Sequence, residues 1–161
     1  MKSFPFIFLF LITGLLHAGD PGKEQIGSLS VELIYATDGG LEQIEPHGKV
    51  LSKGDEKKIR EIKKLSFKEY RSMGTEIPKV LRSYETWATP LRPSKEMLIS
   101  FEPLSRKGDN KLQLVLEYWQ SKRKLFSTNP TLVKGKPLYL LGPKWRDGRV
   151  ILKLKLLELT D

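Results

Sequence analysis

Cysteine is absent from the 161 residues of the chain. A fold held together by disulfides and a cysteine nucleophile are therefore excluded. We also expect no lipid anchor of the kind that exported proteins attach to a cysteine at the cleavage site. The stability of the fold must come from packing, and a chain of this length is large enough to bury one apolar core.

Histidine is nearly absent, with His17 and His47 as the two examples. His17 falls in the N-terminal leader described below, and His47 stands between proline and glycine, which predicts a surface turn. No second metal ligand stands at helical or hairpin spacing from His47, and a Ser-His-Asp triad would have no other base. Phosphate-binding GxxxxGK[ST] and dinucleotide-binding GxGxxG sequences are missing too. We therefore expect no catalytic residue, no cofactor and no metal.

Long apolar runs are also missing, apart from residues 4–16. These 13 residues lack charge, follow the positive Lys2 and lead to the small Ala18, the layout of a secretory signal peptide. The run is shorter than the ~20 residues of a membrane span, which disfavours a membrane anchor. We expect a signal peptide at 1–18, a flexible lead-in at 19–28 and a single β-rich domain at 29–161. The protein is then exported, to the periplasm or the cell exterior.

Basic residues outnumber acidic ones, 28 to 19, and the formal net charge is +9. Because Lys2 is the one charged residue in 1–18, the rest of the chain would carry +8. This charge favours anionic partners, which outside the cytoplasm are acidic polysaccharides, phosphate-bearing envelope polymers or lipid head groups. Nucleic acid is not expected for an exported protein. Solubility alone is the alternative explanation of the charge.

Apolar and polar residues alternate in several short segments that turn signals separate. In residues 150–156 this period of two places Lys153 and Lys155 on the outer face. Similar patterns predict strands at residues 29–36, 96–103, 111–120 and 124–132, and a nearly continuous apolar run predicts one at residues 138–141. Residues 67–90 are less regular, with strands expected within 70–76 and 80–88 and an edge or bulge at Pro78. The spacing predicts a mainly β fold, an antiparallel sandwich or partly open barrel, Ig-like in general architecture.

One short amphipathic helix is expected after the first strand, at residues 52–65. Ser52 is placed to cap its N-terminus, and Glu56 and Arg60 are spaced to form an i,i+4 ion pair. An apolar stripe would dock on a sheet; its members are Ile59, Ile62 and Leu65. The opposite side is strongly basic. It lacks the broad apolar face that insertion into a membrane needs, so we expect that side to lie in solvent.

Two charged turns form the candidate binding site, one at residues 121–123 and one at residues 142–148. In an up-and-down arrangement alternate turns emerge at the same end of a sheet, so these two would meet. They would gather cations around Trp145, and guanidinium groups suit carboxylate or phosphate. The candidate anion-binding residues are Lys122, Arg123, Lys124, Lys144, Trp145, Arg146 and Arg149. The opposite end is basic as well, through Arg106, Lys107, Lys134 and Lys136.

Two parts of this site have simpler explanations. Gly142-Pro143 is expected to end one strand, and Asp147-Gly148 is a strong hairpin signal before the next. Trp145 could instead join Trp87 and Trp119 in an aromatic platform for a sugar or peptide, although aromatic residues of a small β domain usually belong to its core.

Several short segments are similar to a known family. They are Tyr35-Ala-Thr37, Tyr70 before Met73-Gly74, Pro93-Ser-Lys95, and a C-terminal block with Lys124-Leu125, Gly135-x-Pro-Leu138 and Gly142-Pro-x-Trp-x-x-Gly148. Together they resemble a family of small, uncharacterised, secreted bacterial proteins with a C-terminal GPxWxxG hairpin. The resemblance implies an exported, mainly β domain. It implies no activity, ligand or catalytic residue.

Three functions stay open at the level of sequence. The first is a non-enzymatic binding or structural module of the cell envelope that contacts anionic polymers through its basic turns. The second is an assembly component that binds a protein partner through a sheet edge near Pro78. The third, least favoured, is a carboxylate-based hydrolase, for which Glu96, Glu102 and Glu117 are the acids within expected strands.

Overall fold

The computed structural model describes residues 19–42, 48–92 and 94–160. The expected signal peptide, His47 and Pro93 lie outside the described residues. None of the helices within the described ranges has both the length and the apolar character that crossing a membrane would require.

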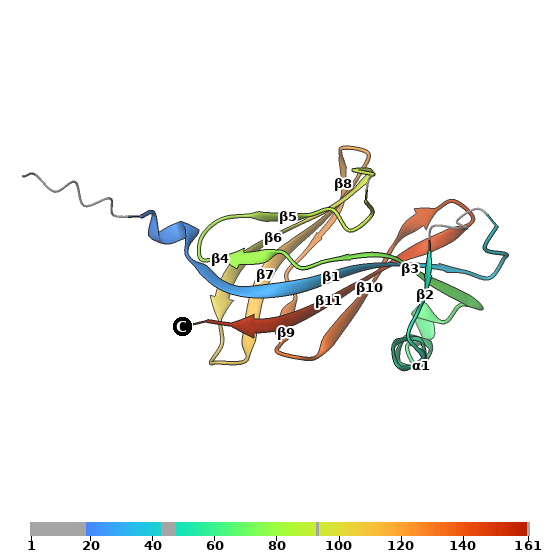
Figure 1. Cartoon of the computed structure of the whole chain (residues 1–161), viewed down its shortest axis with the longest axis horizontal. Coiled ribbons are helices and arrows are strands. Elements are labelled where there is room, and N and C mark those ends of the chain that lie inside the picture. The colour runs from blue at the N-terminus through green and yellow to red at the C-terminus, as the bar shows by residue number, and fades with distance from the viewer. Residues whose placement is uncertain (1–18, 43–47, 93, 161) are drawn as a thin grey trace, which may run out of the picture.

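The strands form two antiparallel sheets that lie against each other (Figure 1). The first, sheet A, has the order β10-β11-β1-β3-β2, and β4 also pairs with β1; its strands are β1 (Gln25–Thr37), β2 (Lys49–Val50), β3 (Glu69–Glu76), β4 (Lys79–Leu81), β10 (Pro137–Trp145) and β11 (Gly148–Leu159). The second, sheet B, has the order β5-β6-β7-β8, and β9 also pairs with β7; its strands are β5 (Thr86–Ala88), β6 (Met97–Arg106), β7 (Lys111–Gln120), β8 (Arg123–Thr128) and β9 (Thr131–Val133). The described residues form no closed barrel. The mainly β, sandwich-like fold that the alternation predicted is confirmed.

The main core lies between the two sheets. The inward residues of β7 are fully buried, and so are those of β11; they are Leu112, Leu114, Leu116 and Tyr118, with Val150, Leu152, Leu154 and Leu156. Burying a large apolar side chain contributes about 1.5–3 kcal/mol, so these alternating positions hold the sheets together.

A second, smaller core covers part of the outer face of sheet A. Ile34 of β1 and Ile151 of β11 point to this face and are fully buried against Ile59 of helix α1 (Lys53–Arg60). Leu65 of the short 3-10 helix η2 (Lys63–Leu65) joins the same cluster. The middle of sheet A therefore has two covered faces, which explains why β1 and β11 are more apolar there than one-sided strands would be.

The helix is shorter than the sequence predicted. Ser52 caps it as expected, because its Oγ accepts a hydrogen bond from Asp55 N, at 3.1 Å. α1 ends at Arg60, and Ile62 takes an extended conformation before η2 begins. The expected stripe is thus wrong at Ile62, which is 40% exposed. A two-residue strand, β2, also lies between β1 and the helix.

Other element boundaries differ from the prediction at the ends. β1 begins at Gln25, so the expected lead-in at 19–28 contains the first four residues of this strand, preceded by a 3-10 helix, η1 (Pro21–Lys23). Gln25 and Ser28 pair with Leu81 and Lys79 of β4. The expected strand at 124–132 is two strands, β8 and β9, separated by Asn129 and Pro130.

Pro78 interrupts a strand, as predicted. β3 and β4 lie on either side of it and both pair with β1, and the Pro78 carbonyl accepts a hydrogen bond from Leu29 N, at 3.1 Å. The chain returns close to the core-facing side of β3, where Glu76 pairs with Val31 of β1, because Thr89 N donates to Glu76 Oε2, at 2.6 Å. The carbonyl of Pro90 also lies so close to Gly74 that a Cβ there would be 1.9 Å from it. These two contacts hold residues 89 and 90 against a face of β3.

Candidate functional site

The turn between β10 and β11 has two residues rather than the expected seven. β10 continues to Trp145, Arg146 and Asp147 form the turn, and β11 starts at Gly148. Gly142 and Pro143 do not end the strand, but lie within it where its pairing with β11 shifts register. A Cβ on Gly142 would lie 3.0 Å from the Val150 carbonyl oxygen, so glycine allows the close approach of the two strands.

Trp145 belongs to the core and does not form the exposed centre of a cationic patch. It is 7% exposed, and its ring meets that of Tyr35 edge to face, with centroids 5.8 Å apart. The Arg146 guanidinium lies over the outer side of the indole, 4.5 Å from a ring centroid. The indole Nε1 donates a hydrogen bond to Glu96 Oε1, at 3.2 Å. Trp145 is therefore a core residue, as aromatic residues of a small β domain usually are, and the Arg146 guanidinium stacks on its ring.

Glu96 joins the two turns that were expected to meet. Its backbone carbonyl accepts from Ser121 N, at 2.8 Å, at the turn between β7 and β8. Its Oε1 accepts both from Gln120 Nε2, at 3.3 Å, and from Trp145 Nε1. The β7–β8 turn on sheet B and the β10–β11 turn on sheet A therefore lie at the same end of the molecule, as alternate turns were expected to do.

The seven candidate residues do not form one cluster. Lys122, Arg123 and Lys144 are exposed, and no ion pair or side-chain hydrogen bond engages them within the described residues. Arg149 is half-buried next to the β10–β11 turn, with its Nε buried and unpaired. Lys124 turns to the outer face of sheet B, where its Nζ bonds Glu117 Oε1, at 2.9 Å. Trp145, by contrast, packs in the core between the sheets.

A cavity of about 270 Å³ opens at this end of the molecule. It is bordered by residues of sheet A and by the segment that leads into β6; they are Met73, Leu91, Arg92, Ser94, Glu96, Trp145 and Arg146. Arg92 forms an ion pair with Glu76 at 2.8 Å. The cavity is lined by both apolar and charged groups, and its lining includes Arg146 of the β10–β11 turn but no residue of the β7–β8 turn.

The three tryptophans do not form a common platform. Trp87 and Trp119 lie together on the outer face of sheet B, with ring centroids 5.8 Å apart and planes tilted by 54°. Lys124 Nζ lies 5.6 Å from the Trp119 ring centroid. The hydrogen bond from Lys124 holds the pKa of Glu117 below its usual value, and that from Trp119 Nε1 adds to this effect. The result is a small aromatic and ionic surface, separate from Trp145.

A second polar cluster, which the sequence did not reveal, lies under α1 on the outer face of sheet A. Lys153 Nζ contacts Glu32 Oε2 at 2.9 Å and Asp55 Oδ2 at 2.8 Å. Tyr139 donates to Asp55 Oδ1 at 3.0 Å, and Ser72 donates to Glu32 Oε1 at 2.6 Å. Asp55 is in the first turn of α1, whereas Lys153 is on β11 and Glu32 on β1. This polar anchor, defined by Glu32, Asp55 and Lys153, therefore ties the helix to the two central strands of sheet A.

The pKa shifts of Asp55 and Lys153 show that hydrogen-bond partners stabilise the charged form of each side chain. Burial acts to raise the pKa of Asp55, but the hydrogen bonds from Lys153, Ser52 and Tyr139 outweigh it and leave that pKa below its usual value. Burial acts to lower the pKa of Lys153, but its bonds to Asp55 and Glu32 leave it raised. Burial and the bond to Asp55 raise the pKa of Tyr139. At neutral pH the cluster is a satisfied ionic network, which stabilises without offering an obvious proton donor or acceptor.

The described residues contain no group of three or more metal-ligating side chains. Comparison of the chain with protein-family models, with curated proteins and with solved structures found no match.

Proposed function

We propose that the protein is an exported, non-enzymatic module of the cell envelope that binds anionic polymers through the basic turns at one end of its two sheets. The observation that carries the proposal is the placement of Glu96, which contacts both turns and fixes them at the same end. Lys122 and Arg123 directly follow Ser121, which bonds the Glu96 carbonyl, and Lys144 directly precedes Trp145, which bonds the Glu96 carboxylate.

These cations have the properties that a polymer contact needs. Lys122, Arg123 and Lys144 are exposed, and within the described part of the chain no carboxylate competes for them. Arg123 offers the planar fork that pairs with carboxylate or phosphate, and the two lysines add point charges. Because they come from two sheets, they suit a ligand long enough to reach both turns.

The proposal is tested by measuring the binding of polygalacturonate, an acidic polysaccharide, as salt is raised from 20 to 200 mM. The variant Lys122→Glu/Arg123→Glu/Lys144→Glu reverses three turn charges. At about 0.5 kcal/mol for each exposed contact, losing three should weaken binding roughly tenfold, and reversal adds repulsion. Binding by the unaltered protein should fall steeply with salt, because exposed charges are screened.

A matched control reverses three charges at the opposite end, in Lys107→Glu/Lys134→Glu/Lys136→Glu. These lysines are also exposed, and the change in net charge is the same. Their reversal should weaken binding much less than reversal at the turns. Equal losses in the two variants would refute a site at the turns, and no binding by the unaltered protein at low salt would refute the polymer function.

A further inference from the structure

The strongest concentration of one charge sign lies away from the turns, on α1 and the residues that follow it. Six lysines in this segment are exposed; they are Lys53, Lys57, Lys58, Lys63, Lys64 and Lys68. No ion pair or side-chain hydrogen bond engages any of them within the ranges that the structure describes. We call these six residues the lysine face.

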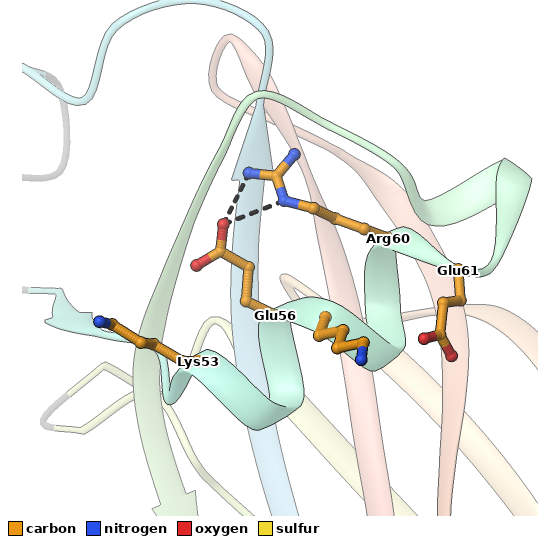
Figure 2. A pocket seen from close by; sticks show the side chains of 5 residues that line it. Lys53, Glu56, Arg60 and Glu61 are labelled. Carbon is orange, nitrogen blue, oxygen red and sulfur yellow. Dashed lines mark hydrogen bonds and ion pairs between the residues drawn. The ribbon is translucent and has the colours of Figure 1, made fainter.

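The acidic residues of the same segment do little to neutralise it. Asp55 points under the helix and bonds Lys153 in the polar anchor. Glu56 is engaged by Arg60, whose nitrogens contact its Oε1 at 2.7 and 3.0 Å (Figure 2). Glu61 is the remaining acid of residues 53–68. Two of the three local acids thus bond cations outside the lysine face, and the six lysine ammonium groups stay exposed.

The shape and chemistry of the lysine face favour diffuse attraction over recognition of a single anionic group. Arg60 is the one guanidinium in the segment, and it is already held by Glu56 and by the carbonyls of Phe67 and Lys68. Figure 2 shows side chains of both signs around the helix; Lys53, Glu56, Lys57, Arg60 and Glu61 border a shallow depression of about 520 Å³. Lysine ammonium groups on flexible stems act as point charges, which suit a broad anionic surface.

Apolar side chains stand at both ends of the helix. Val50, three residues before Lys53, is 79% exposed, and Ile62, two residues after Arg60, is 40% exposed. The apolar side of α1 faces sheet A and is not available to a membrane, because Ile59 is fully buried there. The helix therefore has no stripe to insert into a bilayer, but it has exposed apolar groups beside a dense positive charge.

We infer that the lysine face docks the protein reversibly on anionic lipid head groups. Charge complementarity selects the partner, and a broad lipid surface can contact six exposed lysines spread over residues 53–68 at the same time. Val50 and Ile62 add apolar contact at the interface, and α1 stays on sheet A. This inference goes beyond the proposed binding of polymers, and both contacts can form together, because α1 and the β7–β8 turn occupy different parts of the molecule (Figure 1).

The test is sedimentation with sucrose-loaded vesicles, either pure phosphatidylcholine or a mixture containing about 30% phosphatidylglycerol, at 50 mM salt. The unaltered protein should bind the anionic vesicles and not the neutral ones. Each lysine near an anionic surface strengthens binding about fivefold, so Lys57→Gln/Lys58→Gln/Lys64→Gln should weaken it roughly a hundredfold. Glutamine has a helix propensity close to that of lysine, and no described residue forms an ion pair or side-chain hydrogen bond with the replaced side chains, so α1 should be retained. Circular dichroism would verify the fold.

The matched control, Lys107→Gln/Lys134→Gln/Lys136→Gln, removes the same charge from the far end of the sheets and should weaken vesicle binding less than threefold. Equal losses would show that net charge, not the lysine face, attracts the protein, and would overturn the inference. So would failure of the unaltered protein to bind anionic vesicles. Polygalacturonate binding by the same variants separates the two proposals: a lysine-face variant that loses the polymer and keeps the vesicles would show a polymer site there instead.

Discussion

The outer faces of the two sheets carry similar groups in different surroundings. On sheet A, under α1, Lys153 pairs with Glu32 and Asp55, and the three side chains are 15%, 13% and 21% exposed. On sheet B, Lys124 pairs with Glu117 at 2.9 Å; Glu117 is 19% exposed, much like the acids of the first cluster, but Lys124 is 48% exposed. The two clusters differ in what lies over them. Helix α1 covers the first, and within the described residues no element covers the second.

The cover determines how much each ion pair contributes to stability. Water screens an exposed pair, and holding its long side chains in place costs entropy, so its net contribution is small. A covered pair is screened less, but losing one partner leaves the other desolvated and unpaired. The polar anchor has the further support of hydroxyl groups from Tyr139, Ser72 and Ser52. The two faces therefore differ in their response to mutation more than in their geometry.

The largest effect is expected for Lys153→Met. The substitution keeps much of the apolar stem but leaves the carboxylates of Glu32 and Asp55 without their shared cation. We expect a loss of about 2–4 kcal/mol in the free energy of unfolding, toward the lower part of the range for buried pairs because the cluster is not fully buried. Urea unfolding measures the loss. Lys155→Met is the control, on the same face of β11 but with no ion pair in the described part of the chain, and a similar loss there would contradict a special role for the anchor.

Acidification should weaken the same anchor by a smaller amount. The pKa of Asp55 is lower in the folded state than its usual value of about 3.9, so its contribution to stability is present above about pH 4 and is lost as pH falls through the folded pKa. Urea midpoints measured between pH 6 and pH 2 should fall in the unaltered protein. They should fall less in Asp55→Asn, because this variant lacks the titrating group. Parallel curves for the two proteins would show that Asp55 does not contribute.

The helix cap should contribute less than the anchor. Ser52→Ala removes the acceptor for Asp55 N and one hydrogen bond to the Asp55 carboxylate. Loss of a serine cap costs about 1 kcal/mol. Amide hydrogen exchange should speed up in α1 before it changes in β7. Ser66→Ala, just beyond η2, is the control and should leave exchange in α1 unchanged. Equal protection in both variants would show that the anchor alone holds the helix.

Local patterns predicted much of the fold. Period-two alternation placed β7 at its observed bounds, Lys111–Gln120, and Ser52 caps α1 as the capping pattern indicated. These features depend on residues that are neighbours in sequence or on one face of one strand. The same local pattern placed Lys153 on the outer face of β11, but it gave no sign that the helix would cover it.

The unpredicted features depend on contacts between distant residues. Lys153 meets Glu32 and Asp55 across 121 and 98 positions of the chain, and only the order of strands in sheet A brings them together. At the turns, Trp145 turned inward because Tyr35 and Glu96 provide a ring contact and a hydrogen-bond acceptor. Lys124 turned outward because its register places it beside Trp119. The sequence predicted that the two turns lie at the same end of the molecule, but it did not predict the direction in which each side chain points.

The smallest effect is expected on the uncovered face. Lys124→Gln removes the ion pair with Glu117 and the contact with the Trp119 ring. Water reaches the Lys124 side chain, which is 48% exposed, so the free energy of unfolding should change by less than about 0.5 kcal/mol. A double-mutant cycle with Glu117→Gln isolates the coupling between the two side chains, and raising salt should reduce it further. A coupling as large as the effect of Lys153→Met would mean that something covers this face of sheet B in solution. Repeating the cycle at a tenfold lower protein concentration would then identify the cover as a second copy of the chain, because dilution would uncover the pair and reduce its coupling.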